Sequence, residues 1–336
     1  MRAMVLAAGL GTRLRPVTWS VPKPMVPVLN RPVMEHILRL VESHDITDVI
    51  ANLHWFPDTI TDHFGNGKDL GIRLSYSFEE TLHGTAGGVF KARDFFDDSF
   101  LVISGDALTD IDLTAMREYH ESHDGIATLA TQKVRNTDEF GVVITDDDSR
   151  IQGFQEKPDP AEALSNLANC GIYMFRKEIF DYFPDPGTSK LAKKDGDYPD
   201  EFADWAYDVF PALMEAGIPF YSHEVDAYWN DVGTIDELRQ GTFDGLRGKV
   251  DLHISETEIS PGVYAADGLD LEGVDIEGPA LIGPGCDIGT EVTISGPVVL
   301  GPNCRVGDGV RLTNVILLEG AKVAEDGFAV GGVLGC

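Results

Sequence analysis

Short apolar runs rich in β-favouring residues alternate with stretches of helical spacing along roughly the first 240 residues of the chain. Helical spacing of apolar residues is found at 33–41 and 114–123. Because strands that alternate with helices build a sheet covered by helices, this pattern predicts an α/β domain with a mostly parallel sheet. The runs that predict its strands are 4–7, 48–52, 73–78, 99–104 and 126–131.

After about residue 250 the helical pattern ends, and apolar residues recur every six positions. A hexapeptide repeat is typical of a parallel β-helix, in which each aliphatic side chain points into the core and three six-residue faces complete one coil. The stretch 276–333 therefore predicts about three coils, with Cys286 and Cys304 stacked in adjacent coils as small core residues. The repeat positions are Ile276, Ile282, Ile288, Ile294, Leu300, Val306, Leu312, Leu318, Ala324 and Val330.

This change of period divides the chain into two predicted domains, 1–240 and 251–336. Two domains also fit the length of 336 residues, at about 150 residues per domain. Between 200 and 217, apolar and aromatic side chains recur at three and four residues, which predicts an amphipathic helix packed on the core of the first domain.

Composition narrows the class of protein further. With 43% apolar residues the chain is not disordered, and its net charge of −30 argues against nucleic acid or anionic membranes as partners. No apolar run approaches the roughly 18 residues of a membrane span, and the N-terminus does not have the form of a signal peptide, so we expect a cytoplasmic protein. The cysteines form no C-x-x-C pair, which argues against zinc and favours free thiols; they are Cys170, Cys286, Cys304 and Cys336.

The most informative segment follows the first predicted strand. Gly9 and Gly11 let the backbone approach a ligand, and their N–H groups can hold phosphate oxygens. A Walker A loop is excluded because no lysine stands at the required spacing, and a dinucleotide-binding loop is excluded because Leu14 occupies the third glycine position. What remains is a glycine loop with two cations, Arg13 and Lys23, directed to one site.

These residues resemble the signature of the sugar-1-phosphate nucleotidylyltransferases, and most closely the mannose-1-phosphate guanylyltransferase branch. The resemblance implies a Rossmann-like, GT-A-like nucleotidyltransferase domain followed by a left-handed parallel β-helix. It covers almost the whole chain, because further motifs follow in the family order and the hexapeptide tail completes them. These motifs are Ser104-Gly105-Asp106, Phe140-Gly141-Val142, Glu156-Lys157-Pro158, Asn169-Cys170-Gly171 and Trp229-Asn230-Asp231-Val232-Gly233.

The implied reaction joins a nucleoside triphosphate and a sugar 1-phosphate, and pyrophosphate leaves. The attacking phosphate oxygen is already an anion, so cations and positioning dominate catalysis and no general base is needed. Arg13 is expected to stabilise the leaving pyrophosphate, and Lys23 to contact the α-phosphate or the sugar phosphate. Asp106 and Asp231 are expected to hold Mg²⁺, although spacing alone fits turn or capping aspartates equally well.

The resemblance also implies the substrate contacts. The segment 80–88 is the expected base site, where Gly84 and Gly87 leave room for a flat base, whereas His83 is expected to be a loop residue and not a ligand. The nucleotide-binding residues are then Leu6, Ala8, Gly9, Gly11, Thr12, Gly84, Thr85 and Gly87. The sugar-phosphate residues are Gly141, Glu156, Lys157 and Asn169.

GTP and mannose 1-phosphate are the favoured substrates, because Gly84-Thr85-Ala86-Gly87 resembles the guanylyltransferase branch. The alternatives are uridylyl, thymidylyl or cytidylyl transfer to glucose 1-phosphate, and a non-catalytic regulatory subunit that binds nucleotide sugar. A hexapeptide acyltransferase is disfavoured because the predicted coils contain no histidine. The short β-helix, with exposed ends and flat faces, predicts a homo-oligomer. All of this requires Arg13, Lys23, Lys157, Asp106 and Asp231 to converge on one cleft.

Overall fold

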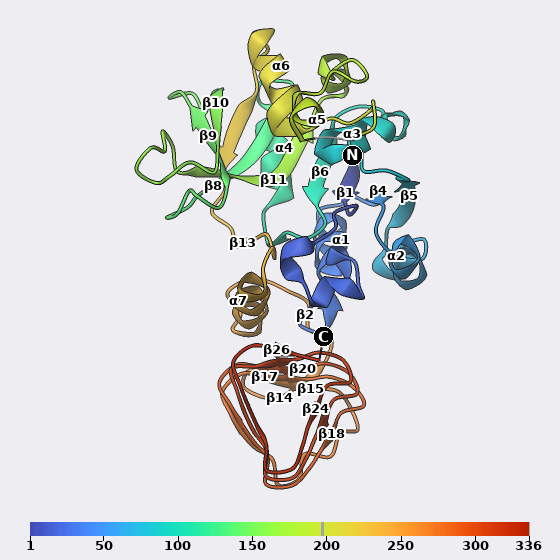
Figure 1. Cartoon of the computed structure of the whole chain (residues 1–336), viewed down its shortest axis with the longest axis vertical. Coiled ribbons are helices and arrows are strands. Elements are labelled where there is room, and N and C mark those ends of the chain that lie inside the picture. Colours follow the sequence, from blue (N-terminus) through green and yellow to red (C-terminus); the bar gives the residue numbers. More distant parts are fainter. Residues whose placement is uncertain (196–197, 336) are drawn as a thin grey trace. The chain divides into compact units, whose positions relative to one another are not determined.

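A computed structural model describes residues 1–195 and 198–335 of the chain (Figure 1). These residues form two compact units, each with its own hydrophobic core. The first, called here the sheet unit, comprises Met1–Leu10, Ile37–Ala107 and Ile111–Trp229. The second, called the coil unit, comprises Gly11–His36, Leu108–Asp110 and the residues from Asn230 onward. The predicted domain boundary between 240 and 251 stays a prediction.

Parallel strands form the centre of the sheet unit. Their order is β6-β1-β4-β5, so the chain continues from β1 to β4 and β5 on one side and later places β6 on the other side. The position where the strand order reverses is the switch point at which ligands bind in open α/β sheets. The predicted alternation of strands and helices is confirmed here, because these strands are the expected apolar runs. Their bounds are β1 (Arg2–Leu6), β4 (Asp48–Leu53), β5 (Arg73–Phe78) and β6 (Phe100–Ser104).

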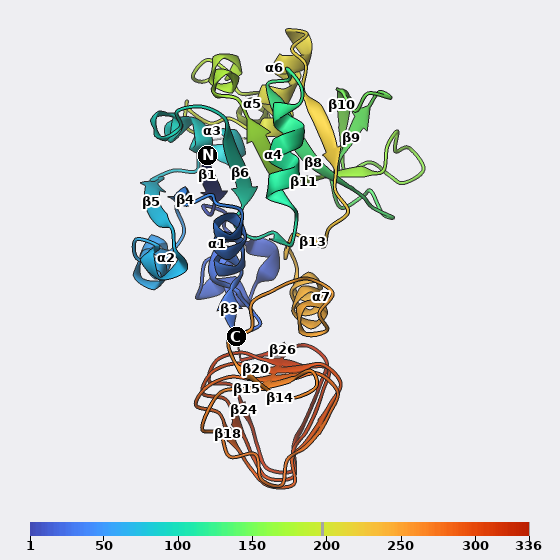
Figure 2. The same cartoon turned by 180° about the vertical axis from the view of Figure 1, so that it is seen from behind.

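Antiparallel strands extend the sheet beyond β6. The long strand β11 pairs antiparallel with β6, β8 and β9, and β12 adds to β8 in the parallel sense. The added strands are β8 (Ala127–Lys133), β9 (Gly141–Thr145), β10 (Ile151–Glu156), β11 (Leu167–Phe175) and β12 (Tyr221–Glu224). Figure 2 shows α4 (Leu113–Glu121) lying against β8 and β11, so the predicted helix at 114–123 covers this part of the sheet.

The other helices of the sheet unit are short. The predicted helix at 33–41 is confirmed as α1, which begins in the coil unit and ends in the sheet unit. The predicted helix at 200–217 begins only at Trp205, as a π-helical turn to Val209 that continues into α6, because Asp204 accepts the first N–H groups and starts the helix there. The bounds are α1 (Val33–Ser43), α2 (Pro57–Phe64), α3 (Gly84–Lys91), α5 (Lys190–Asp195) and α6 (Phe210–Glu215).

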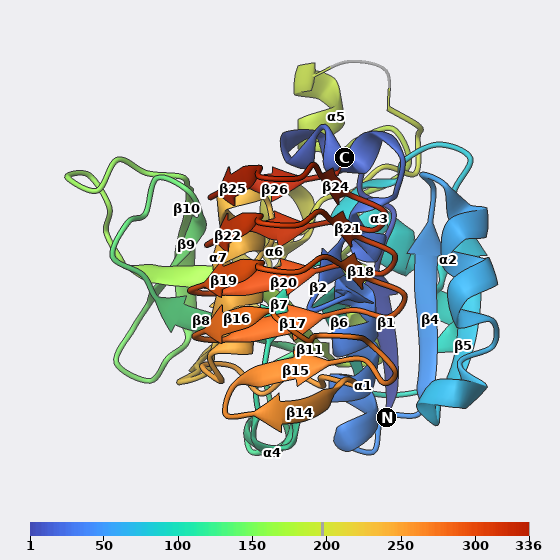
Figure 3. The ribbon, with the colours of Figure 1, turned by 90° about the horizontal axis from the view of Figure 1, so that it is seen from below.

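Short parallel strands of the coil unit stack in three sheets, as Figure 3 shows in orange to red. Ile276 pairs with Ile294, and Ile294 with Leu312, so the chain returns to the same face after 18 residues. These parallel strands are consistent with a β-helix. The three sheets are β14-β15-β17-β20-β23-β26, β16-β19-β22-β25 and β18-β21-β24, and only β14 and β15 pair antiparallel.

The strands of these three sheets are two to four residues long. They are β14 (Thr257–Ser260), β15 (Val263–Ala265), β16 (Asp275–Glu277), β17 (Ala280–Ile282), β18 (Asp287–Ile288), β19 (Thr293–Ser295), β20 (Val298–Leu300), β21 (Arg305–Val306), β22 (Arg311–Thr313), β23 (Ile316–Leu317), β24 (Lys322–Val323), β25 (Phe328–Val330) and β26 (Val333–Leu334).

The predicted core positions 318, 324 and 330 are wrong by one residue. Leu312 pairs with Ala329, 17 residues later, and Val330 is 67% exposed whereas Ala329 is 5% exposed. The cause is one corner that is a residue shorter than the corner below it. Three residues separate Ser295 from Val299, but only two separate their partners, Thr313 and Ile316. The core residues in the last coil are therefore Leu317, Val323 and Ala329.

Two cysteines lie in adjacent coils as predicted. The pairing of Asp287 with Arg305 sets Cys286 beside Cys304, and Cys304 is fully buried in the core. Together with Cys170 they are free thiols, whereas Cys336 lies outside the described residues.

Before the coils lie short elements that belong wholly or partly to the coil unit. They are three 3-10 turns at Thr12–Leu14, Val17–Trp19 and Lys23–Met25, the hairpin of β2 (Pro27–Val28) and β3 (Arg31–Pro32), the strands β7 (Leu108–Thr109) and β13 (Trp229–Asn230), and helix α7 (Ile235–Leu246). Thr234 caps α7 by accepting a hydrogen bond from the Glu237 N–H, at 3.2 Å. Among the described residues, no helix has the length and apolar character needed to cross a membrane.

Candidate nucleotide site

The carboxyl ends of β1 and β6 lie side by side and position the start of the glycine loop. Leu6 pairs with Ser104, and the Gly105 N–H donates to the Leu6 carbonyl at 2.9 Å. A Cβ on Gly105 would lie only 2.9 Å from that carbonyl oxygen, so this turn requires glycine. Asp106 follows directly and accepts a hydrogen bond from the Ser104 hydroxyl. Asp106 therefore lies at the carboxyl edge of the sheet.

A cavity of ≈ 390 Å³ opens at this edge within the sheet unit. Its volume is within the range of small-molecule sites. Six of the predicted residues line it, namely Leu6, Ala8, Gly9, Gly84, Thr85 and Asp106. Seven further residues complete the lining, namely Asn52, Glu79, Leu82, Ser104, Tyr198, Phe202 and Asp204.

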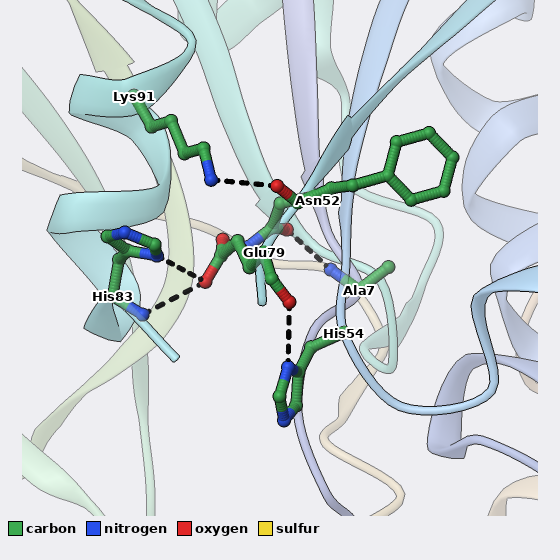
Figure 4. Close-up of polar contacts among 7 residues, drawn as sticks. Ala7, Asn52, His54, Glu79, His83 and Lys91 are labelled. Carbon is green, nitrogen blue, oxygen red and sulfur yellow. Dashed lines mark hydrogen bonds and ion pairs between the residues drawn. The ribbon is translucent and has the colours of Figure 1, made fainter. Parts of the chain in front are cut away.

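A buried hydrogen-bond chain includes two residues of the cavity lining, Asn52 and Glu79 (Figure 4). The Ala7 N–H donates to Asn52 Oδ1 at 2.9 Å, and Asn52 Nδ2 donates to Glu79 Oε1 at 2.7 Å. The other carboxylate oxygen of Glu79 accepts from the His83 N–H at 2.9 Å and lies 3.3 Å from His83 Nδ1. One buried carboxylate therefore connects the beginning of the glycine loop with the segment before Gly84.

Sequence reasoning missed Asn52 and Glu79, although each stands where the edge rule could have found it. Asn52 is the second-last residue of β4, and Glu79 directly follows β5. Both therefore stand at the carboxyl ends of parallel strands. His83 contacts Glu79 and is not part of the cavity lining. The Glu79 backbone is held as well, because its carbonyl lies 2.8 Å from His54 Nδ1.

The glycines of the segment 84–88 allow close packing of backbone against backbone. A Cβ on Gly84, where φ is +79°, would lie 2.4 Å from the Ala203 carbonyl oxygen, and a Cβ on Gly87 would lie 2.7 Å from that of Glu201. The N–H groups of Ala86 and Gly87 both donate to the Ala203 carbonyl at 3.0 Å. Glycine is therefore needed here because α3 packs against the backbone of 201–203. The predicted role of these glycines in leaving room for a base stays a prediction.

Asp204 is the second acidic residue of the cavity that sequence reasoning missed. Its carboxylate accepts from the Thr85 hydroxyl at 2.8 Å and from the N–H groups of Ala206 at 2.9 Å and Tyr207 at 3.2 Å. Burial raises its pKa above the ordinary aspartate value, and these hydrogen bonds oppose the rise. The signal in the sequence was an aspartate in the N-cap position of an amphipathic run.

The predicted sugar-phosphate residues lie in the sheet unit. Glu156 pairs with Gly141, where a Cβ would come within 3.1 Å of Glu156 Oε2. Partial burial raises the pKa of Glu156, Lys157 lowers it, and the charge of Asp204 raises it further. Asn169 donates from Nδ2 to the Tyr173 hydroxyl at 3.1 Å.

The remaining predicted residues belong to the coil unit, where two cations meet one aspartate. Lys23, which is only 9% exposed, donates from Nζ to the Asp231 carbonyl at 3.1 Å. Arg13 Nη2 lies 3.9 Å from Asp231 Oδ2, and the arginine side chain is 60% exposed. The guanidinium passes close to Gly233, where a Cβ would lie 3.1 Å away. Arg13, Lys23 and Asp231 are therefore together; Gly11 and Thr12 precede them in the same unit.

Comparison with known proteins identifies the family. The family model described as "Nucleotidyl transferase" matches residues 2–246. The chain belongs to this family. The chain is 36% identical over 321 residues to a UTP–glucose-1-phosphate uridylyltransferase of Synechocystis sp., which covers 85% of this chain and 79% of that protein. It is 31% identical over 294 residues to a mannose-1-phosphate guanylyltransferase of Mycobacterium tuberculosis, with coverage of 85% and 76%.

Solved structures agree on the fold. The crystal structure of a putative glucose-1-phosphate thymidylyltransferase from Bacillus anthracis superposes with a TM-score of 0.64 at 24% identity, covering 75% of this chain and 97% of that chain. The Rossmann-like α/β fold of this nucleotidyl transferase is thereby confirmed. The two relatives of this chain named above are sugar-1-phosphate nucleotidyltransferases, and their names differ in both the base and the sugar.

The chemistry of Asp106 and of Asp231, each taken by itself, suits magnesium. Asp106 is in the sheet unit and Asp231 in the coil unit, and no group of three or more His, Cys, Asp or Glu suited to a metal occurs among residues 1–195 and 198–335. Magnesium does not require such a group, because one or two carboxylates with substrate phosphate oxygens and water complete its shell. Both residues offer the hard oxygen donors that magnesium prefers.

Proposed function

We propose that this chain transfers a nucleoside monophosphate from a nucleoside triphosphate to a sugar 1-phosphate and releases pyrophosphate. The observation that carries the proposal is the cavity at the carboxyl ends of β1 and β6, lined by the start of the glycine loop and by Asp106. Backbone N–H groups of the loop suit phosphate oxygens, and the family match to residues 2–246 supports the reaction class.

In the proposed reaction an oxygen of the sugar phosphate attacks the α-phosphorus in line with the leaving pyrophosphate. Arg13 binds the leaving group as a planar, permanently charged fork, and Lys23 holds the α-phosphate or the sugar phosphate. Asp106 and Asp231 would hold Mg²⁺, which when bound neutralises phosphate charge. The nucleophile is an anionic phosphate oxygen, so no proton has to be removed from it. Beyond these contacts, the protein only has to orient the two substrates for in-line attack.

Glu79 favours guanine as the base. Glu79 is one of the residues that line the cavity, its side chain is 1% exposed, and a carboxylate only accepts hydrogen bonds. The Watson–Crick edge of guanine offers two adjacent donors, whereas uracil offers one donor between two carbonyl oxygens. A buried acceptor that faces a carbonyl costs free energy, so Glu79 supports GTP over UTP.

For the sugar phosphate we propose mannose 1-phosphate, bound by Glu156 and Lys157 with the help of Gly141 and Asn169. Glu156 accepts hydrogen bonds from hydroxyl groups, and Lys157 neutralises the phosphate. UTP with glucose 1-phosphate is the second candidate, because the uridylyltransferase relative shares 36% identity over 85% of the chain.

A panel of GTP, UTP, dTTP and CTP against mannose and glucose 1-phosphates, with pyrophosphate release in the presence of Mg²⁺ as the readout, tests the proposal. We expect the largest kcat/KM for GTP with mannose 1-phosphate. A larger value for UTP with glucose 1-phosphate would establish the second candidate, and no turnover with any pair would refute the enzyme and favour a non-catalytic nucleotide-sugar-binding subunit.

We also propose that 1–240 is the catalytic domain and that 251–336 is a left-handed parallel β-helix serving assembly. The three stacked sheets support this, because coils that bury their core leave an open edge at each end. We expect a homo-oligomer, and light scattering that gave the monomer mass, near 36.6 kDa, across micromolar concentrations would contradict it.

A further inference from the structure

The segment Gly11–His36, which carries Arg13 and Lys23, belongs to the same compact unit as the C-terminal strands. Its tip is the turn of the β2–β3 hairpin, formed by Leu29 and Asn30 with φ of +50° and +62°. Asparagine tolerates this left-handed conformation, but leucine adopts it only under strain that surrounding contacts must offset. The turn therefore has a conformation that packing enforces.

The coils supply the contact that holds this turn. Asn30 Nδ2 donates to the Leu300 carbonyl of β20 at 3.0 Å, and the same carbonyl accepts the Gly283 N–H at 2.8 Å. A Cβ on Gly283 would lie 2.9 Å from Asn30 Nδ2, so the approach is possible only because residue 283 is glycine. Leu29 is 1% exposed, and its Cδ1 would lie 2.9 Å from a Cβ on Gly245.

The other end of the segment carries the cations. Lys23 donates to the Asp231 carbonyl. The Val33 N–H donates to the Val26 carbonyl at 3.0 Å, which joins the end of the β2–β3 hairpin to the residue directly after the Lys23–Met25 turn. Six residues thus separate Asn30 from Lys23, and short-range hydrogen bonds tie this stretch together. A displacement of the hairpin tip would be transmitted to the lysine.

We infer that Asn30 is a positioning residue: its hydrogen bond to Leu300 lets the C-terminal strands set the place of Lys23 and Arg13. The inference rests on the proposed function, in which these cations stabilise phosphate charge. Such stabilisation depends on preorganised donors, and a displacement of about 1 Å can cost up to about 10²-fold in rate. The C-terminal strands then support catalysis directly, in addition to assembly.

The test uses the full chain with Asn30→Asp, which keeps the shape and the tolerance of positive φ but replaces the amide donor with a carboxylate facing a carbonyl. We expect kcat for pyrophosphate release to fall on the order of tenfold, with KM for the triphosphate unchanged within about twofold, because the base cavity lies in the other unit. Asn30→Gly, which retains the turn but lacks the amide, should give a similar fall if Asn30→Asp does not fold.

The matched control is Asn303→Asp, an asparagine in the coils with φ of +60° whose amide lies 3.4 Å from Glu319 and which is not in the segment. It should keep the kcat of the unmodified protein. Hydrogen exchange of 11–36 provides a second readout that needs no activity, and Asn30→Asp should speed it whereas Asn303→Asp should not. Wild-type kcat and exchange in Asn30→Asp would overturn the inference. An unmodified protein without turnover would refute the proposed function instead, and exchange would still decide the positioning contact.

Discussion

Asn52 Nδ2 donates to Glu79 Oε1 over 2.7 Å, and this single hydrogen bond joins the ends of two neighbouring parallel strands at the cavity. Asn52 is 3% exposed and Glu79 is 4% exposed. The pair fits against α3, because a Cβ on Gly88 would lie 2.6 Å from Glu79 Oε1. Since Asn52 also accepts from the Ala7 N–H, the pair keeps the glycine loop and the segment before Gly84 in one arrangement.

Glu79→Gln should reduce the preference for GTP. Glutamine turns an N–H₂ group toward a donor, either Asn52 Nδ2 or the His83 N–H, so one charge-assisted hydrogen bond is lost. Glutamine also replaces the carboxylate that is proposed to accept from guanine. A hydrogen bond to a charged group contributes about 1.5–3 kcal/mol, which corresponds to roughly tenfold to a hundredfold in kcat/KM for GTP. The value for UTP should fall less. Exposed Glu80 provides the control Glu80→Gln, and equal losses for both nucleotides in Glu79→Gln would contradict the base assignment.

Arg13→Ala should lower kcat by about 10²–10³-fold, the usual effect of removing one preorganised donor to developing charge. Because the side chain is 60% exposed, the melting temperature should change little. Arg13→Lys should recover part of the rate, since the charge remains but the planar fork is lost. Arg15→Ala, in the same loop and also exposed, is the comparison; an equal loss there would show a general charge effect and not a specific contact.

Asp231→Asn should raise the Mg²⁺ concentration required for half-maximal rate by about tenfold or more, because a carboxylate ligand becomes a weaker amide. Its backbone carbonyl still accepts from Lys23, so the local structure should persist. The control is Asp236→Asn, whose side chain is 94% exposed in the same segment. A wild-type magnesium titration in Asp231→Asn would remove this residue from the proposed site.

His120 should make the protein sensitive to acid. Burial, together with Arg176 and His123, lowers the pKa of His120 from 6.5 to about 3, so below pH 6.5 the unfolded chain binds a proton that the folded protein does not. The free energy of unfolding should then fall with decreasing pH between about 6.5 and 3, by up to about 1.4 kcal/mol per pH unit from this group.

Unfolding by urea between pH 4 and pH 7 measures this dependence. His120→Asn should flatten it while lowering the stability at pH 7, because the fully buried ring and its 2.8 Å contact with Thr128 Oγ1 are lost. Exposed His253→Asn should leave the slope unchanged. An identical slope in His120→Asn and the unmodified protein would mean that another group causes the acid sensitivity.

The local pattern of the sequence was sufficient for the central parallel strands, for two of the helices and for the family. Strands such as Asp48–Leu53 and helices such as Leu113–Glu121 follow from periodicity, because burial of one face requires a fixed spacing along the chain. The glycine loop and Asp106 at the end of a strand were predictable for the same reason. Even the repeat failed only after Leu312, where the loss of a single corner residue moved Ala329 into the core in place of Val330.

Tertiary structure decided which side chains complete the site. Asn52, Glu79 and Asp204 have no motif of their own, and they reach one cavity only because strand order and the packing of 201–203 on α3 bring distant segments together. In the same way, only the fold pairs Asn30 with Leu300, 270 residues away. Hydrophobic spacing is a property of neighbouring residues, whereas a polar contact between distant segments depends on the whole path of the chain between them.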